Sequence, residues 1–144
     1  MRHLIVASLL LFLAWSSAYA DSTNDACRVV DRYVSAFNAN DLDKLVAVYA
    51  PDVTTLSLFG KTFVEGRETL RGYFANIPGS GFTVALGERH AVQVGNGVVL
   101  CAGFYTFTLI RDGKPAPTPA RYSMVTAKRG NTWLILHHHA SLQP

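Results

Sequence analysis

The sequence contains few cysteines and few charged residues, and it lacks the short motifs that mark common enzyme families. Two cysteines among 144 residues are too few to build a fold from disulfides, and they lack the paired C-x-x-C spacing of structural zinc sites. No G-x-G-x-x-G, P-loop, H-E-x-x-H or G-x-S-x-G motif occurs. The sequence therefore gives no motif-based reason to assign the protein to the nucleotide-dependent enzymes, the zinc proteases or the α/β-hydrolases.

The charge balance is close to neutral. The chain has 13 Lys and Arg residues against 10 Asp and Glu residues, and its basic residues are scattered apart from the pair Lys128 and Arg129. A nucleic-acid-binding protein would concentrate basic residues on one face or along one helix. We therefore expect no nucleic-acid partner. Hydrophobic residues make up 49% of the chain, which is typical of a globular domain with an apolar core.

Residues 1–20 are predicted to be a secretory signal peptide. Arg2 and His3 precede an apolar run from Leu4 to Trp15, and Ala18 and Ala20 form an A-x-A cleavage site. The alternative is an uncleaved anchor, but spanning a bilayer takes about 20 apolar residues and this run is shorter. We expect export to the periplasm or the extracellular space, and no membrane attachment of the mature chain. Residues 21–144 then form a single domain.

Helical periodicity follows the cleavage site. Apolar residues recur at intervals of three and four from Val30 to Phe37, and Asn38 and Asn40 interrupt the pattern. Asp41 is a good N-cap for a second short helix that ends before Pro51. A third helix is predicted over GRETLRGYFANI, with Leu70, Tyr73, Phe74 and Ile77 on one side.

Most of the remaining chain is predicted to be strand. The two short segments VTTLSLF and KTFV precede the third helix, and four longer segments follow it: FTVALGERHAVQV, VVLCAGFYTFTLI, ARYSMVTAKR and TWLILHHHASL. Gly103 lies in the middle of a long strand and is a plausible site for a bend or bulge. The order of elements predicts an α+β fold, in which a curved antiparallel sheet wraps around N-terminal helices and leaves a pocket.

A family resemblance rests on three segments: RVVDRYVSAFNANDLDKLVAVYAPDVTTLS, FVEGRETLRGYF and RYSMVTAKRGNTWLILHHHASL. Together they resemble the nuclear-transport-factor-two-like superfamily. Within it they are most similar to bacterial proteins related to the association domain of calcium/calmodulin-dependent kinase two, and to polyketide-cyclase-like proteins. The resemblance implies a cone-shaped α+β barrel, homodimers or larger rings, and an apolar cavity between the first helix and the sheet. Because the fold serves both enzymes and binding modules, it does not select a function.

The resemblance also implies which residues face the cavity. In the kinase association domain, arginines on the last three strands lie in the cavity; the aligned residues here are Thr106, Met124 and Ala140, so an anionic ligand of that kind is not expected. The cavity side is expected to carry Phe104, Tyr122, Met124, Leu134, Leu136 and His138. The outer side, where such folds dimerise, is expected to carry Tyr105, Arg121, His137, His139 and Trp133, with Phe107, Val125 and Ile135 adding apolar surface.

Strand alternation separates the three consecutive histidines. His137 and His139 share one face and His138 takes the other, so the three cannot bind one metal ion, and we predict neither a metal site nor another cofactor. His138 is the candidate acid or base because imidazole titrates near neutral pH. The alternative is a packed, hydrogen-bonded core histidine. Tyr33, Tyr49, Tyr73 and Tyr122 are candidates for orienting a ligand, or are simply core aromatics.

Two functions stay open. One is a secreted binding or oligomerisation domain for a small apolar or mixed-polarity molecule; the other is a cofactor-independent lyase or isomerase that uses His138 with a tyrosine. Export also permits a disulfide between Cys27 and Cys101, although the strand register assumed above turns Cys101 away from the first helix. A complete acid–base pair in the cavity would favour the enzyme, and a wholly apolar cavity the binding protein.

Overall fold

The computed structural model describes residues 23–144, so the predicted signal peptide lies outside the described residues. The chain is helical over residues 23–38. The further elements are α2 (Leu42–Ala47), β1 (Tyr49–Leu56), β2 (Val64–Glu65), α3 (Arg67–Tyr73), β3 (Thr83–Gly95), β4 (Val98–Arg111), β5 (Lys114–Arg129) and β6 (Thr132–Leu142). All three predicted helices and all six predicted strands are present among these residues.

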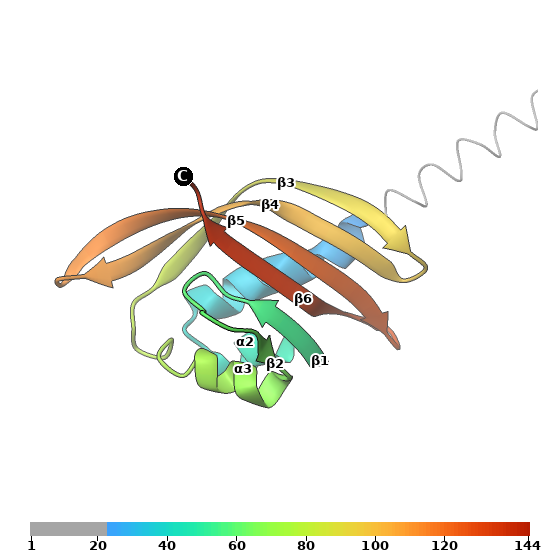
Figure 1. The fold of residues 1–144 in the computed structure, drawn as a ribbon, viewed down its shortest axis with the longest axis horizontal. Helices are drawn as coiled ribbons and strands as arrows, with labels where there is room; N and C mark the ends of the chain where they lie inside the picture. Colours follow the sequence, from blue (N-terminus) through green and yellow to red (C-terminus); the bar gives the residue numbers. More distant parts are fainter. Residues whose placement is uncertain (1–22) are drawn as a thin grey trace, which may run out of the picture.

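The strands form one curved sheet in the order β2-β1-β6-β5-β4-β3, and the N-terminal helix packs against its concave side (Figure 1). This is the predicted α+β fold. Neighbouring strands are antiparallel with one exception, because β1 runs parallel to β6. No helix within residues 23–144 is long and apolar enough to cross a bilayer.

The end of the N-terminal helix is tied to the start of β3 by two asparagines. Asn38 mimics a neighbouring strand, since its side chain accepts a hydrogen bond from the Val84 N–H (2.7 Å) and donates one to the Val84 carbonyl (3.0 Å). Asn40 adopts a positive φ of 52° and donates to the Phe82 carbonyl. Asp41 then caps α2 by accepting from the Lys44 N–H at 3.0 Å, as predicted. The residues that end the helix therefore also fix its position on the sheet.

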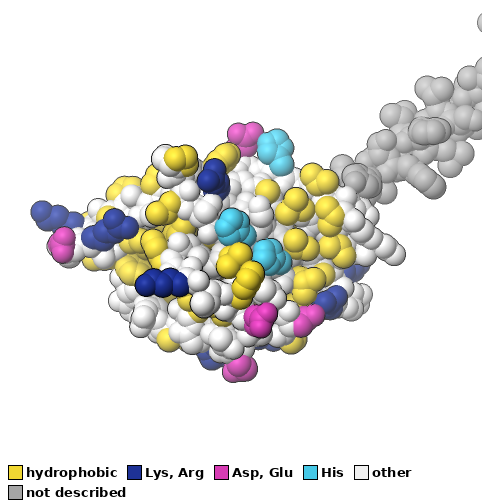
Figure 2. Space-filling model, viewed as in Figure 1, with side chains coloured by type: hydrophobic (Ala, Val, Ile, Leu, Met, Phe, Trp, Pro, Cys, Tyr) yellow, Lys and Arg dark blue, Asp and Glu magenta, His cyan; other side chains and the backbone are white. Residues whose placement is uncertain are grey.

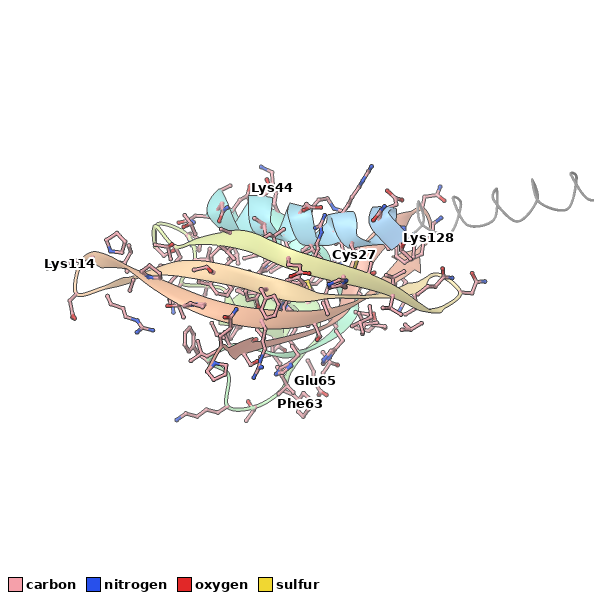
Figure 3. The ribbon with its side chains drawn as sticks, turned by 90° about the horizontal axis from the view of Figure 1, so that it is seen from above. Cys27, Lys44, Phe63, Glu65, Lys114 and Lys128 are labelled. Carbon is pink, nitrogen blue, oxygen red and sulfur yellow. A yellow bond between two sulfur atoms is a disulfide. The ribbon has the colours of Figure 1, made fainter. Side chains whose placement is uncertain are left out.

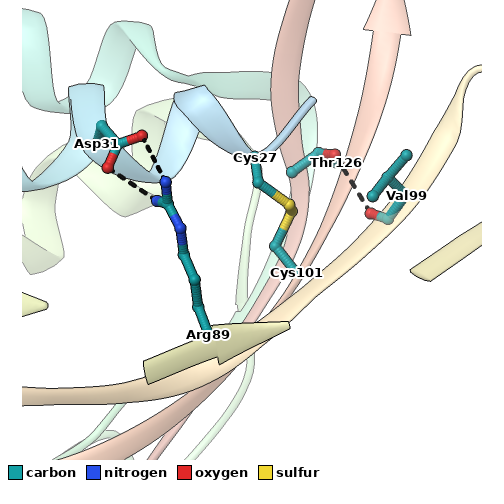
Figure 4. The surroundings of a disulfide bond; sticks show 6 residues. All are labelled: Cys27, Asp31, Arg89, Val99, Cys101 and Thr126. Atoms are coloured by element: carbon teal, nitrogen blue, oxygen red, sulfur yellow. Dashed lines mark hydrogen bonds and ion pairs between the residues drawn. A yellow bond between two sulfur atoms is a disulfide. The ribbon is translucent and has the colours of Figure 1, made fainter. Parts of the chain in front are cut away.

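A disulfide joins Cys27 of the N-terminal helix to Cys101 of β4, with 5.8 Å between the Cα atoms. Close to it, Arg89 of β3 donates two hydrogen bonds to the Asp31 carboxylate, at 2.8 and 3.1 Å (Figure 4). Both cysteines are buried. The helix is therefore held on the sheet by a covalent link and an ion pair on the same stretch of its length (Figure 4). Figure 3 shows Cys27 on the side of the helix that faces the strands.

The facing of β4 is the reverse of the prediction. Odd-numbered residues of β4 point to the concave side: Cys101, Tyr105 and Phe107 are buried, whereas Phe104 is 46% exposed. The pattern did contain the correct signal, because the even positions 106 and 108 are threonine while 105, 107 and 109 are tyrosine, phenylalanine and leucine. The same reversal explains why Cys101 reaches the helix.

A bulge in β6 changes the facing of its first residues. Val125 pairs with His137 and Thr126 pairs with Ile135, so Leu136 is an extra residue on β6. An extra residue reverses the facing of everything on one side of it. Ile135 is accordingly buried on the concave side and Trp133 packs against the core. The predictions that Leu134 and Leu136 face the cavity, and that Trp133 and Ile135 lie on the outer face, are therefore wrong.

Gly103 lies where β3 bulges toward β4. The register of the two strands shifts between Leu86 and Arg89, opposite Gly103. A Cβ atom on Gly103 would overlap the Glu88 carbonyl oxygen and lie 2.9 Å from the Arg89 Cα. The predicted irregularity is therefore present, but the one extra residue lies on the neighbouring strand β3.

Replacing Gly103 with alanine should lower the free energy of unfolding by about 1–3 kcal/mol, because backbone has to move to admit the methyl group. Gly72→Ala is the matched control: Gly72 lies in α3, and a Cβ there meets no atom within 4 Å, so the change should be neutral or stabilise the helix by about 0.5–1 kcal/mol. Urea unfolding of both variants measures the difference. Equal stability of the two would contradict the close approach at Gly103.

Candidate functional site: an aromatic pocket around His138

A pocket of about 270 Å³ opens between the N-terminal helix, the β1–β2 connection, α3 and the concave face of the sheet. Its deep end is formed by aromatic rings and His138. The lining residues are Tyr33, Phe37, Tyr49, Thr55, Ser57, Leu58, Phe59, Leu70, Tyr73, Phe74, Asn76, Ile77, Phe82, Tyr105, Phe107, Leu109, His138 and Ala140. None of these is an Asp, Glu, Lys or Arg.

Three elements hold the parts of this pocket in place. His138 lies on β6 between Thr55 of β1 and Met124 of β5, so its backbone is fixed on both sides. Gly66 precedes α3 with a φ of 79°, and Arg67 donates from Nε to the Tyr49 carbonyl at 3.0 Å. The E-G-R turn of the sequence therefore anchors α3, which supplies Leu70 and Tyr73 to the pocket wall, to the first residue of β1.

Both ring nitrogens of His138 have tyrosine partners. The Tyr49 hydroxyl lies 2.9 Å from Nδ1 and the Tyr105 hydroxyl lies 3.4 Å from Nε2, while the Tyr33 ring meets the imidazole edge-on at 5.5 Å between centroids. A neutral imidazole has one donor and one acceptor nitrogen. One tyrosine hydroxyl therefore accepts from the ring and the other donates to it.

Burial sets the protonation states of this cluster. The pKa of His138 is lowered to about 3, chiefly because burial disfavours the charged imidazole and to a smaller extent through electrostatic repulsion from His137 and His139. Burial also raises the pKa values of Tyr33, Tyr49 and Tyr105 above the usual value. At neutral pH the imidazole is uncharged and all three phenols are protonated. The pocket is therefore polar in places but carries no charge.

Two tyrosine hydroxyls of the pocket are left for a ligand. Tyr33 and Tyr73 line it, and neither hydroxyl forms a hydrogen bond with another residue of the described chain. Ser57 and Asn76 add polar atoms among the lining residues. The arrangement can therefore bind one polar group of an otherwise apolar molecule.

Of the predicted ligand-binding residues, Tyr33, Tyr49 and Tyr73 line this pocket together with His138. Tyr122 and Met124 are buried on the concave side but are not among the lining residues. Phe104 is on the outer face and does not reach the pocket, which corrects the prediction. The Tyr122 hydroxyl is buried without a hydrogen-bond partner in the described chain.

Some of the residues predicted for the outer face of the sheet lie there, and others lie on the concave side. Arg121, which donates to the Ser141 hydroxyl at 3.0 Å, pairs with Phe104 of β4, and both are exposed on the outer side together with His139. His137 is partly exposed beside them. Tyr105, in contrast, is 1% exposed and lines the pocket. It was missed as a pocket residue because the adjacent aromatics Phe104 and Tyr105 by themselves fit either facing; the threonines at 106 and 108 are the signal that identifies the correct one.

Comparison with known proteins places the chain in a family. The model of the calcium/calmodulin dependent protein kinase II association domain family matches residues 22–144. An association-domain protein of Xanthomonas campestris shares 30% identity over 80% of this chain and 83% of its own, with a TM-score of 0.73.

Two more distant structures share the fold. An NTF2-like protein with a cystatin-like fold from Novosphingobium aromaticivorans is 13% identical over 90% of this chain and 87% of its own, with a TM-score of 0.73. The CamKII hub homology domain of Chlamydomonas reinhardtii is 21% identical over 83% of this chain and 98% of its own, with a TM-score of 0.68. The resemblance inferred from the sequence is confirmed: the chain belongs to the calcium/calmodulin-dependent protein kinase II association domain family.

Proposed function

We propose that this protein is an exported binding domain for a small, uncharged, largely apolar molecule that carries one hydrogen-bonding group. The observation that carries the proposal is the pocket around His138, which is lined by aromatic and aliphatic side chains and by no charged residue. A dry cavity of about 150 Å³ is enough to hold benzene. A volume of about 270 Å³ therefore suits a molecule of one or two rings.

The polarity of the pocket selects against charged ligands. A carboxylate moved into this site would lose its hydration and meet no cation in return, which is costly. Hydroxyl groups of Tyr33 and Tyr73 can instead donate to a carbonyl or accept from a phenol. We infer that the ligand is neutral, and that its polar end is recognised by these two hydroxyls.

Acid–base catalysis is less well supported by the same geometry. His138 already has a tyrosine on each ring nitrogen, and its lowered pKa makes it a weak base at neutral pH. No carboxylate among the described residues lines the pocket as a second catalytic group. The arrangement thus favours binding over the lyase or isomerase alternative.

The test is a titration of the mature protein with three ring compounds of similar size, namely phenol, benzaldehyde and benzoate, followed by calorimetry. We expect the two neutral compounds to bind and benzoate to bind at least tenfold more weakly. Tyr33→Phe should weaken binding of benzaldehyde by about 2- to 12-fold, the equivalent of one hydrogen bond of about 0.5–1.5 kcal/mol. Tyr122→Phe is the matched control, since this buried hydroxyl lies outside the pocket, and should leave binding unchanged. Preferential binding of benzoate would overturn the proposal.

Export is supported by an observation independent of the predicted signal peptide. Disulfides form and persist in oxidising compartments such as the periplasm, and Cys27 and Cys101 are joined. The intact mass of the exported protein would show whether cleavage occurs after Ala20.

Self-association is proposed for the outer face of the sheet, with a second copy of this chain as the partner. A row of apolar side chains on β3 and β4 faces away from the helix, with Val92 55%, Phe104 46% and Ile110 40% exposed, and Figure 2 shows apolar side chains gathered on this face. Burying such a patch against its own copy is the simplest way to remove it from water. Arg121, His137 and His139 lie at the border of this proposed interface.

A further inference from the structure

The lining of the pocket around His138 changes from its deep end to its mouth. Three tyrosines at the deep end, Tyr33, Tyr49 and Tyr105, are at most 2% exposed. Phe59 also lines the pocket, but its side chain is 55% exposed. Because Phe59 belongs to the connection between β1 and β2, this connection forms part of the mouth. The Phe59 side chain is therefore both pocket wall and apolar surface in contact with water.

A turn fixes the position of Phe59. The Gly60 N–H donates a hydrogen bond to the Ser57 carbonyl at 3.0 Å, which closes a four-residue turn with Phe59 as its third residue. The Ser57 hydroxyl lies 3.2 Å from the Thr55 hydroxyl, and Thr55 belongs to β1 where that strand pairs with β6. The wall that Phe59 provides is therefore in place before a ligand binds.

A second partly exposed aromatic side chain borders the mouth from α3. Tyr73 lines the pocket, is 37% exposed and packs edge-on against Phe74, with 5.1 Å between the ring centroids. The pocket opens on the concave side of the sheet, whereas copies of this chain are proposed to meet through the outer face. The mouth with its two rings therefore stays accessible when copies associate.

The volume of the pocket limits how much of a long ligand it encloses. A cavity of about 150 Å³ holds benzene, so roughly 25 Å³ is needed for each carbon atom. By this measure the 270 Å³ of the pocket is filled by a phenol ring that carries a chain of about four carbons. Further carbons of a longer chain have to leave through the mouth, where Phe59 offers them apolar surface.

We propose that the ligand of this pocket is a neutral ring compound with an apolar chain, of the alkylphenol or alkyl aryl ketone class, and that its chain leaves the pocket across Phe59. This inference rests on the binding function proposed above and extends it from compact rings to rings that carry a chain. A compact ligand leaves the Phe59 side chain in water, whereas a chain covers Phe59 and is covered by it. Each methylene group that is fully removed from water strengthens binding by about fourfold.

The experiment compares 4-ethylphenol with 4-hexylphenol by calorimetry on the mature protein. We expect the wild type to bind the hexyl compound at least about tenfold more tightly, since the longer chain adds four methylenes of which some stay in water. F59A should weaken binding of 4-hexylphenol by about fivefold or more and leave that of 4-ethylphenol nearly unchanged, because only the longer chain reaches the mouth. F59L keeps an apolar side chain there and should retain most of the affinity for 4-hexylphenol.

F63A is the matched control. Phe63 belongs to the same connection as Phe59 and is 59% exposed, but it is not among the residues that line the pocket. The F63A variant should therefore bind both phenols like the wild type. Thermal unfolding should show that the three variants are as stable as the wild type, since neither phenylalanine is in the core.

The results separate a failure of this inference from a failure of the binding function. Equal affinity of the wild type for the two phenols would overturn the inference and leave the binding function standing. The same holds if F59A binds 4-hexylphenol like the wild type, if it loses affinity for both phenols equally, or if F63A loses as much as F59A. If neither phenol binds the wild type, the proposed function fails and this inference fails with it.

Discussion

Replacing Cys27 and Cys101 with serine is expected to lower the free energy of unfolding by about 2–5 kcal/mol. The two cysteines are 74 residues apart in the sequence, so the bond closes a long loop in the unfolded chain. In the chain-entropy model a loop of this length corresponds to roughly 4 kcal/mol. Both side chains are also buried, and serine hydroxyls in their place would be poorly solvated. Urea unfolding of the oxidised wild type and the double variant measures the difference.

A matched control separates the bond from the ion pair beside it. Asp31→Asn removes the bidentate pair with Arg89, whose side chains are 46% and 36% exposed, and an exposed pair of this kind contributes about 0–1 kcal/mol. Wild type unfolded in a reducing agent should behave like the double serine variant. If the double variant unfolds at the same urea concentration as the oxidised wild type, the bond does not stabilise the fold.

Lowering the pH should destabilise the protein through His138. In the unfolded chain this imidazole has the ordinary pKa of 6.5, whereas in the folded protein burial lowers the pKa to about 3. Between these values protons bind the unfolded chain and not the folded one. The stabilisation is therefore complete above pH 6.5 and is lost as the pH falls toward 3, by up to about 1.4 kcal/mol per pH unit.

The measurement is the slope of the unfolding free energy between pH 6.5 and 4.5, above the range in which most carboxylates titrate. His138→Gln should flatten this slope even if the variant is less stable at every pH, because glutamine does not titrate. His90→Gln, at an exposed position, should keep the wild-type slope. A His138→Gln variant with the full wild-type slope would show that another group carries the pH dependence.

Much of the architecture could be predicted because each element carries its own local signal. Asp41 marks the start of α2, the Gly130-Asn131 turn marks the β5–β6 hairpin, and the periodic residues mark the N-terminal helix. The predicted segment ARYSMVTAKR starts at Ala120, whereas β5 starts at Lys114 and includes Pro115, Pro117 and Pro119. These prolines lie where β5 extends beyond its pairing with β6, which ends at Ala120 and Leu142, and strand edges tolerate proline.

The candidate site was harder to predict because it depends on which way each strand faces. Tyr33, Tyr49 and His138 line the same pocket; the family resemblance put His138 on the cavity side, and Tyr33 lies on the periodic stripe of the N-terminal helix. Tyr105 and Phe104 were exchanged because both are aromatic and adjacent. The bulge at Leu136 has no marker in the sequence, so the facing of Trp133 and Ile135 needed the three-dimensional pairing of β5 with β6.

The strands at the two ends of the sheet have a consequence for how copies of this chain can meet. An exposed strand edge is a template on which another chain can add a strand and start aggregation. Here one end is β2, which has two residues, and the other is β3, whose ladder is interrupted opposite Gly103 and which carries Glu88 and Arg89 at that point. Short or bulged edges of this kind resist extension. Copies are therefore directed to stack face to face instead of joining into a continuous sheet.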